Sequence, residues 1–242
     1  MPSLEPTAFH LIAGTLIMVV GSLLQASVGF GIALFVVPLL VLLNPVFVPG
    51  PMLFASLFLA AIMAFRGWSA IDLKKLGLAG VGLFVGTAAG AMALMIVAAD
   101  KWPKLFAVFI LVAVALSASG IHIPVTRRNL VAAGIISGVM GTISGIHGPP
   151  MALLYQREPG NIVRATLAIF FVMAYAIALI ALGTIGLFGK KELLLGLTLA
   201  PGVIAGYIVA RFSTKLLDRG YWLRLAILTV ASLSAIALIF RK

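Results

Sequence analysis

The segment GTISGIHGPP (residues 141–150) separates two apolar runs in the second half of the chain. A related segment, QASVGFG (residues 25–31), separates two runs in the first half. Glycine and proline in such positions end or bend helices. The runs that follow, Gly31–Leu43 and Met151–Gln156, are shorter than the roughly 20 residues needed to cross about 30 Å of hydrocarbon. The two segments therefore predict a pair of broken helices.

The composition of the whole chain is that of a membrane protein. Of 242 residues, 63% are hydrophobic and 10% are charged, and the mean hydropathy is +1.23. Soluble domains are about 45–50% apolar and about 25% charged, so a soluble chain of this length could not shield its apolar side chains from water. The net charge of +11 does not indicate nucleic-acid binding, because the basic residues stand singly or in pairs between apolar runs.

Eight further apolar runs are long enough to be read as full spans. They are Phe9–Ser27, Pro51–Phe65, Leu76–Ala99, Leu105–Ile123, Leu130–Ser144, Val163–Phe188, Leu193–Ala210 and Trp222–Phe240. Together with the two short runs, they predict an all-α polytopic membrane protein of eight full spans and two short or broken segments.

The two halves of the chain resemble each other. A spacing of 117 residues superposes Gly21 on Gly138, Ser27 on Ser144 and Gly31 on Gly148, and GTAAG (residues 86–90) matches GVIAG (residues 202–206) at a spacing of 116. The agreement in order predicts an internal duplication. Residues 1–123 would form the first repeat and residues 124–242 the second, within a single integral membrane domain.

The loop charges favour a topology in which both short segments cross. In that case one side of the membrane carries eleven basic residues and the other six, whereas the ratio is nine to eight if neither crosses. The first distribution satisfies the positive-inside rule better. Five helices per repeat is an odd number, so the two repeats would be inverted. Their broken helices are then expected to meet near the midplane.

The inventory of polar residues narrows the chemistry. All six acidic residues lie outside the predicted spans or at their ends: Glu5, Asp72, Asp100, Glu158, Glu192 and Asp218. The sequence therefore lacks the intramembrane carboxylates on which many proton relays and cation sites depend. It also contains no cysteine and no carboxylate pair for hydrolysis. No enzyme activity, metal site or cofactor is expected.

Small, neutral polar residues remain at the two breaks. Helix N-termini at such breaks present N–H groups and the positive end of a dipole, which favour an anion. The candidate anion-binding residues in these segments are Gln25, Ser27, Gly29, Gly31, Thr142, Ser144 and Gly148. Close packing of membrane helices is the alternative role of the glycines and serines.

Two ionisable residues complete the predicted site. His147 is the ionisable side chain placed deep in a break, so we expect it to contact the ligand or to couple transport to protons. Its alternative role is a structural hydrogen bond. Arg164 begins an apolar run, where it would act either as an interfacial anchor or as a funnel or gate for anions.

The two breaks carry a family resemblance. The chain resembles the TauE/SafE family of bacterial transporters in GFGIALFVVPLL (residues 29–40), in SGIHGPPMALL (residues 144–154) and in the helix start Arg164-Ala165-Thr166. The resemblance covers essentially the whole chain. It implies a multi-pass protein of the bacterial inner membrane that transports small sulfur oxyanions or organosulfonates, such as sulfite or sulfoacetate.

These observations predict a secondary transporter of small anions that works by alternating access. A passive anion channel is the alternative, and a membrane-embedded enzyme or an assembly factor fits the residues less well. The expected partners are a small anionic substrate and the lipid bilayer, and no nucleic acid. Any proton coupling is expected to run through His147 or through protonation of the substrate. The sequence leaves the oligomeric state open, a homodimer included.

Overall fold

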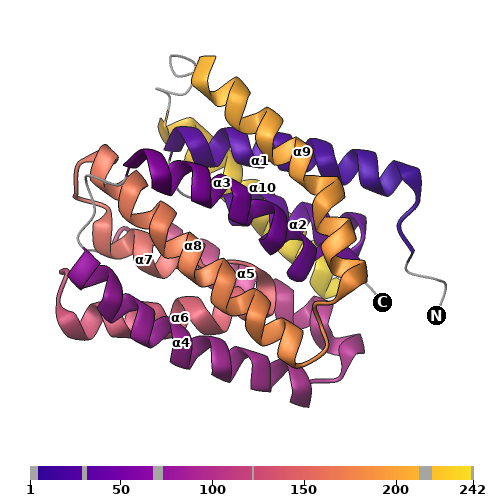
Figure 1. Ribbon diagram of the computed structural model, residues 1–242, viewed down its shortest axis with the longest axis horizontal. Helices are drawn as coiled ribbons and strands as arrows, with labels where there is room; N and C mark the ends of the chain where they lie inside the picture. Colours follow the sequence, from indigo (N-terminus) through magenta and orange to yellow (C-terminus); the bar gives the residue numbers. More distant parts are fainter. Residues whose placement is uncertain (1–4, 29–31, 68–72, 122, 213–219, 241–242) are drawn as a thin grey trace.

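The computed structural model describes residues 5–28, 32–67, 73–121, 123–212 and 220–240. These described residues form ten α-helices and no strand (Figure 1). The helices are α1 (Ala8–Val28), α2 (Ile32–Leu43), α3 (Gly50–Gly67), α4 (Leu73–Ile96), α5 (Trp102–Ala118), α6 (Arg127–Ser144), α7 (Gly148–Tyr155), α8 (Gly160–Thr184), α9 (Lys190–Phe212) and α10 (Gly220–Phe240). Short 3-10 helices, η1 (Pro45–Phe47) and η3 (Ala99–Lys101), precede α3 and α5.

Each of the ten apolar runs in the sequence appears as one helix, with local differences at the ends. The helix α7 starts at Gly148 and not at Met151 because proline is tolerated in the first turn, where its missing N–H breaks no hydrogen bond. The helix α8 ends four residues before the predicted Phe188. Gly186 adopts a φ of 76°, and the N–H of Leu187 returns to the carbonyl of Leu182 at 2.8 Å, which closes the helix.

Six helices of the described chain are long and apolar enough to cross a membrane: α1, α3, α4, α5, α8 and α9. Eight full spans were expected. The first turn of α6 carries Arg127, Arg128 and Asn129, which lower its mean hydropathy, and the described apolar part of α10, Ile227–Phe240, is shorter than a full span. The architecture is that of an all-helical, multi-pass membrane protein.

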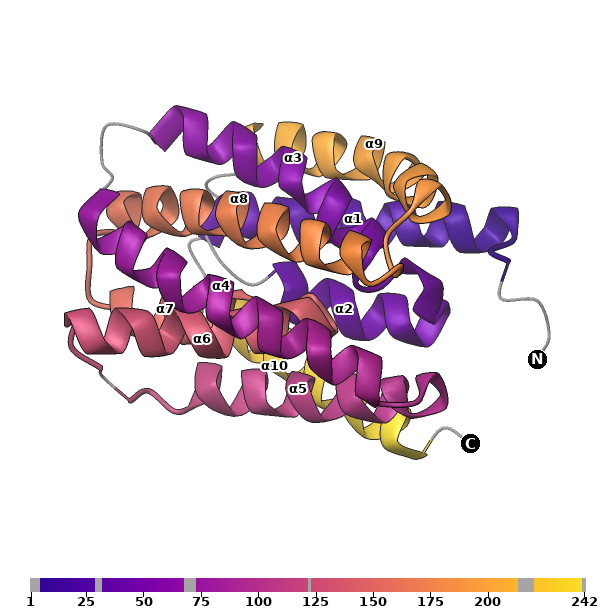
Figure 2. The same cartoon turned by 60° about the horizontal axis from the view of Figure 1, so that its bottom comes forward.

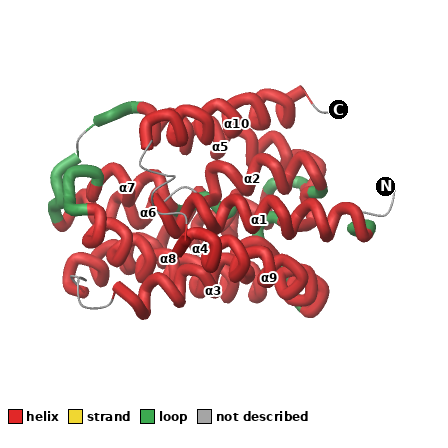
Figure 3. The backbone as a smooth tube through the Cα atoms, turned by 90° about the horizontal axis from the view of Figure 1, so that it is seen from above, coloured by secondary structure: helices red, strands yellow, loops and turns green. Residues whose placement is uncertain are grey.

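The helix ends gather at two opposite ends of the bundle (Figures 2 and 3). Both chain termini lie at one end, where α1 begins, and α6 begins at the opposite end. The short helices α2 and α7 each return the chain to the end from which its hairpin started. Each helix of the first half therefore runs opposite to its counterpart in the second half.

Packing partners are exchanged between the two halves. The two most extensive helix pairs are α4 with α6 and α1 with α9. If α1 corresponds to α6 and α4 to α9, each pair is the counterpart of the other. The pairs α3 with α8 and α5 with α10 join corresponding helices directly, and α2 with α10 matches α7 with α5. This is the pattern expected if a two-fold axis relates the two halves.

Glycines allow the exchanged helices to approach closely. A Cβ added at Gly82 or Gly86 of α4 would overlap the backbone carbonyl of Val131 or Ile135 in α6. In the same way, a Cβ at Gly206 of α9 would overlap the carbonyl of Val19 in α1. Lipid provides little hydrophobic drive for helix association, so close van der Waals contact at small residues holds such helices together.

We predict that Gly86→Ala lowers the free energy of unfolding by about 2 kcal/mol, because the added methyl group forces α4 away from α6. Gly77→Ala on the same helix is the matched control. A Cβ at Gly77 meets nothing within 4 Å, so this change should leave stability equal or slightly higher, since alanine is the better helix former. Thermal unfolding in detergent measures both. Equal unfolding midpoints for the two variants would contradict the role of the glycine contact.

Candidate functional site

The second break is a tight turn in the interior of the protein. Gly145 has a φ of 83°, in the left-handed region that favours glycine, and its N–H donates to the carbonyl of Gly141 at 2.7 Å, which ends α6. A Cβ at Gly145 would lie 3.0 Å from Cε of Met52 and 3.5 Å from Cγ2 of Val37. The break from the second half is therefore packed against α3 and α2 of the first half.

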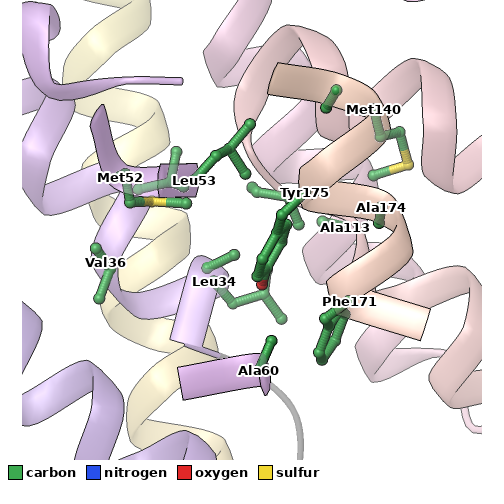
Figure 4. Packing of buried hydrophobic residues seen from close by; sticks show 14 of the residues in the cluster. Leu34, Val36, Met52, Leu53, Ala60, Ala113, Met140, Phe171, Ala174 and Tyr175 are labelled. Carbon is green, nitrogen blue, oxygen red and sulfur yellow. The ribbon is translucent and has the colours of Figure 1, made fainter. Parts of the chain in front are cut away.

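His147 lies at the centre of this break and is only 1% exposed. Its ring lies directly on the backbone of Gly141, where any Cβ would overlap it. The ring also meets Tyr175 of α8 edge-on, with centroids 5.4 Å apart and an interplanar angle of 72°. Tyr175 in turn stacks on Phe171 at 5.6 Å. Figure 4 shows Tyr175 and Phe171 within the buried apolar cluster that includes side chains of α2 and α3.

The imidazole of His147 lacks a satisfactory protein partner. Neither Nδ1 nor Nε2 makes a hydrogen bond of good geometry within the described chain, although the ring interacts electrostatically with the backbone of Gly145. Among titratable side chains, that of Tyr175 packs against the imidazole ring. Buried polar groups are almost always hydrogen-bonded, so an unsatisfied imidazole at a helix break is a strong candidate for ligand contact.

The N-terminus of α7 offers fewer donors than the sequence suggests. The first backbone N–H groups of a helix have no partner within it. At α7 two of these positions are Pro149 and Pro150, which have no N–H, so the backbone N–H groups of His147 and Gly148 remain. Gly148 is itself confined, because a Cβ there would lie 3.3 Å from Phe171. An anion at this break would depend on the imidazole as much as on the helix dipole.

Two more predicted residues carry buried, unsatisfied polar atoms. Thr142 is fully buried in the last turns of α6, and Gln25 is fully buried in the last turns of α1. Within the described ranges, neither the hydroxyl of Thr142 nor the amide of Gln25 has a hydrogen-bond partner. The spacing of 117 residues relates these two positions, so each half places an unsatisfied polar group just before its break.

The two predicted serines are used within their own helices. The hydroxyl of Ser27 donates to the carbonyl of Leu23 at 2.8 Å, and that of Ser144 donates to Met140 at 2.7 Å. The two bonds are equivalent under the same spacing. A serine that bonds its i−4 carbonyl has no proton left for an anion. Either serine would have to rotate its hydroxyl away from the helix to bind one.

The other predicted residues lie elsewhere. Gly29 and Gly31 are outside the described residues. Arg164 is exposed in the first turns of α8, at the end of the bundle, where it shares a cavity with Arg66 and Arg211. The structure thus brings Thr142, Ser144, His147 and Gly148 together at one break and places Arg164 away from them.

Sequence reasoning missed three features of the site. Gly141 stands in the segment that defines the break, but its contact with His147 depends on how the chain turns back. Tyr175 and Phe171 lie four residues apart on α8, a spacing that indicates a shared helix face but not its neighbour.

The described acidic residues, Glu5, Asp100, Glu158 and Glu192, all lie outside the helices or in a first turn, as predicted.

We predict that Gly141→Ala destabilises the protein because its methyl group displaces the His147 ring. In a His147→Ala background the same change should be tolerated, since the overlapping ring is gone. Thermal unfolding of the two single variants and the double variant gives the coupling, which we expect to be about 1 kcal/mol or more. An identical effect of Gly141→Ala in both backgrounds would show that the ring is not what Gly141 accommodates.

Comparison with known proteins assigns the chain to a family. The family model for the sulfite exporter TauE/SafE matches residues 14–238, nearly the whole chain. No protein of curated function and no solved structure gives a significant match. The matched region contains both helix breaks and all ten helices except the first turns of α1 and the end of α10. The chain therefore belongs to the TauE/SafE sulfite exporter family of membrane transport proteins.

Proposed function

We propose that this protein is a secondary transporter of small sulfur oxyanions or organosulfonates in the bacterial inner membrane. The observation that carries the proposal is His147: an imidazole buried at a helix break, whose ring nitrogens have no hydrogen bond of good geometry from a side chain or backbone group of the described chain. The family supports the class of substrate. The anion would be held by the imidazole, by the N–H of Gly148 and by the hydroxyl of Thr142.

The arrangement of the helices supports alternating access as the mechanism. We infer that residues 1–123 and 124–242 are inverted repeats, because corresponding helices run in opposite directions and exchange packing partners. Inverted repeats allow a bundle to open toward either side of the membrane around one central site. The second break packs on α2 and α3, so a movement of one half against the other would change the surroundings of His147.

The neutral interior explains how such a site could release its ligand. A buried arginine or lysine would hold an anion through full charge, whereas an imidazole, one amide and one hydroxyl hold it through hydrogen bonds. Hydrogen bonds of this kind are worth about 0.5–1.5 kcal/mol each, and those to a charged group about 1.5–3 kcal/mol. A binding energy of this size favours turnover over tight retention.

We predict saturable uptake of radiolabelled sulfite or sulfoacetate by proteoliposomes that contain the protein. Unlabelled anion on the opposite side should accelerate uptake, because a carrier returns faster when loaded. A thermal-shift series with sulfite, thiosulfate, taurine, sulfoacetate and matched carboxylates selects the anions to be tested. Flux that does not saturate and shows no counterflow would identify a passive channel, and no flux of any small anion would refute the proposal.

We predict that His147→Ala reduces flux at least tenfold, while His147→Gln retains part of it and, when flux is measured between about pH 5 and 8, loses any pH dependence that requires a proton on the imidazole. Glutamine keeps an N–H donor but cannot carry a proton. A sulfonate substrate makes the measurement clean, because it stays ionised across this window. Ser137→Ala is the control, since Ser137 of α6 is another buried side chain whose polar atom has no hydrogen-bond partner in the described part of the chain. A glutamine variant with the unaltered pH profile would eliminate proton coupling through His147.

A further inference from the structure

A cavity of about 320 Å³ opens at one end of the bundle, between α1, α3, α8 and α9. Arg66 from α3, Arg164 from α8 and Arg211 from α9 all line it. Tyr207, Asn161 and Ala26 are among its other walls. The three arginines come from parts of the sequence that are far apart, so only the folded helices bring them together.

The positive charge of this cavity is not neutralised by the described protein. None of the described residues that line it is acidic. The Nη1 of Arg66 donates to the hydroxyl of Tyr207 at 2.8 Å, and its guanidinium lies 6.0 Å from the centre of the tyrosine ring. This contact orients one arginine but leaves its charge in place. Three like charges around one space repel each other, and an anion among them relieves that repulsion.

The chemistry of the walls suits an oxyanion. A guanidinium presents several N–H donors in a planar fork that matches the oxygens of a carboxylate, phosphate or sulfonate group. The volume lies at the lower limit of small-molecule sites, which is enough for a small organosulfonate. Arginine is suited to such a role because it remains charged and is weakly hydrated compared with lysine.

The last turns of α1 form one wall of the cavity. Ala26, in this wall, is the neighbour of Gln25, whose amide is fully buried and has no hydrogen-bond partner among the described residues. Both residues lie in the last turns of α1. An anion in the cavity is therefore next to the segment that carries the unsatisfied polar group of the first half.

A cavity at the opposite end of the bundle has different chemistry. This cavity, of about 400 Å³, is walled mainly by apolar side chains such as Trp102, Phe106 and Leu187, and its charged lining residue is Glu192. A symmetric carrier would have equivalent sites at its two ends, but this basic cavity lies at one end. By the positive-inside rule this is the cytoplasmic end, because it also carries Arg127, Arg128 and Arg157.

We propose that the cavity of Arg66, Arg164 and Arg211 is a recruiting site that binds the transported oxyanion at the cytoplasmic end, before the anion reaches the helix breaks. This inference rests on the proposed function in taking the transported anion as the ligand. The site concentrates anions and excludes cations through its field, which fixed charges on low-dielectric walls strengthen. It makes the two ends of the carrier unequal in affinity.

The absence of cysteine from the natural sequence allows a test that does not depend on transport. Ala26→Cys places a thiol in the basic cavity, and Val46→Cys places the matched control thiol in the apolar cavity at the other end. Each is treated with a methanethiosulfonate reagent that carries a sulfonate and with one that carries a quaternary ammonium. We expect the ratio of anionic to cationic reaction rates to be about tenfold higher at Ala26→Cys than at Val46→Cys, and to fall with added salt.

Charge substitutions connect that ratio to the arginines. Arg66→Gln, Arg164→Gln and Arg211→Gln should each reduce the ratio at Ala26→Cys and raise the KM for sulfite about three- to tenfold. Arg157→Gln is the matched control, because this exposed arginine lies at the same end and does not line the cavity. Equal reagent ratios at the two thiols, or the same ratio in all four variants, would overturn the proposal.

Lipid headgroups are the other source of an oxyanion, and membrane composition distinguishes them. The reagent ratio is measured in nanodiscs of phosphatidylcholine alone and with phosphatidylglycerol. We expect the anionic preference in both. If it disappears with phosphatidylglycerol, a headgroup occupies the cavity and the recruiting site is refuted. Absence of flux of any small anion through the unsubstituted protein refutes the proposed function and the ligand assignment together, whereas flux with unaltered KM in the arginine variants refutes the recruiting site alone.

Discussion

Backbone amides and carbonyls cannot remain unsatisfied in hydrocarbon, and the rest of this structure depends on that constraint. A helix broken at membrane depth exposes such groups, so it survives only where protein or a wet cavity covers it. Here the break between α6 and α7 lies beneath α2, α3 and α8. The surrounding long helices cover the hairpins α1–α2 and α6–α7. Of the candidate spans, α8 is the most deeply buried.

The cover requires helices to approach closely without help from the hydrophobic effect. Glycines on α4 meet backbone carbonyls on α6, and glycines on α9 meet backbone carbonyls on α1. These are the two most extensive helix pairs, and α6 and α1 are the helices that precede the breaks. The same residue type has a different role at Gly141, where the missing side chain makes room for the His147 ring. Packing and site thus draw on one property of glycine, its lack of a Cβ atom.

In the proposed function, the interior binds the anion without a charged side chain at the break, and one end of the bundle attracts it. The described bundle interior has neither a carboxylate nor a guanidinium at the break, and polar contact there rests on His147, Thr142 and backbone N–H groups. Three arginines line the cavity at one end of the bundle. An arrangement of this kind avoids the cost of a charged side chain at the bilayer centre. In the proposed function, the residues that attract the anion are therefore separate from those that bind it at the break.

Much of the fold could be predicted from the sequence because the length and polarity of a helix are local properties. Ten apolar runs, the two breaks at 25–31 and 141–150 and the exclusion of acidic residues from the spans all follow from residues close together in the chain. The positions of the ionisable residues in the sequence also determined that the ionisable group at a break is His147. Tertiary structure alone decided that the Ser144 hydroxyl bonds its own helix, that Gly141 accommodates the imidazole and that Arg66, Arg164 and Arg211 share one cavity. Those facts depend on which helices pack together and in what rotation, and no short stretch of sequence contains that information.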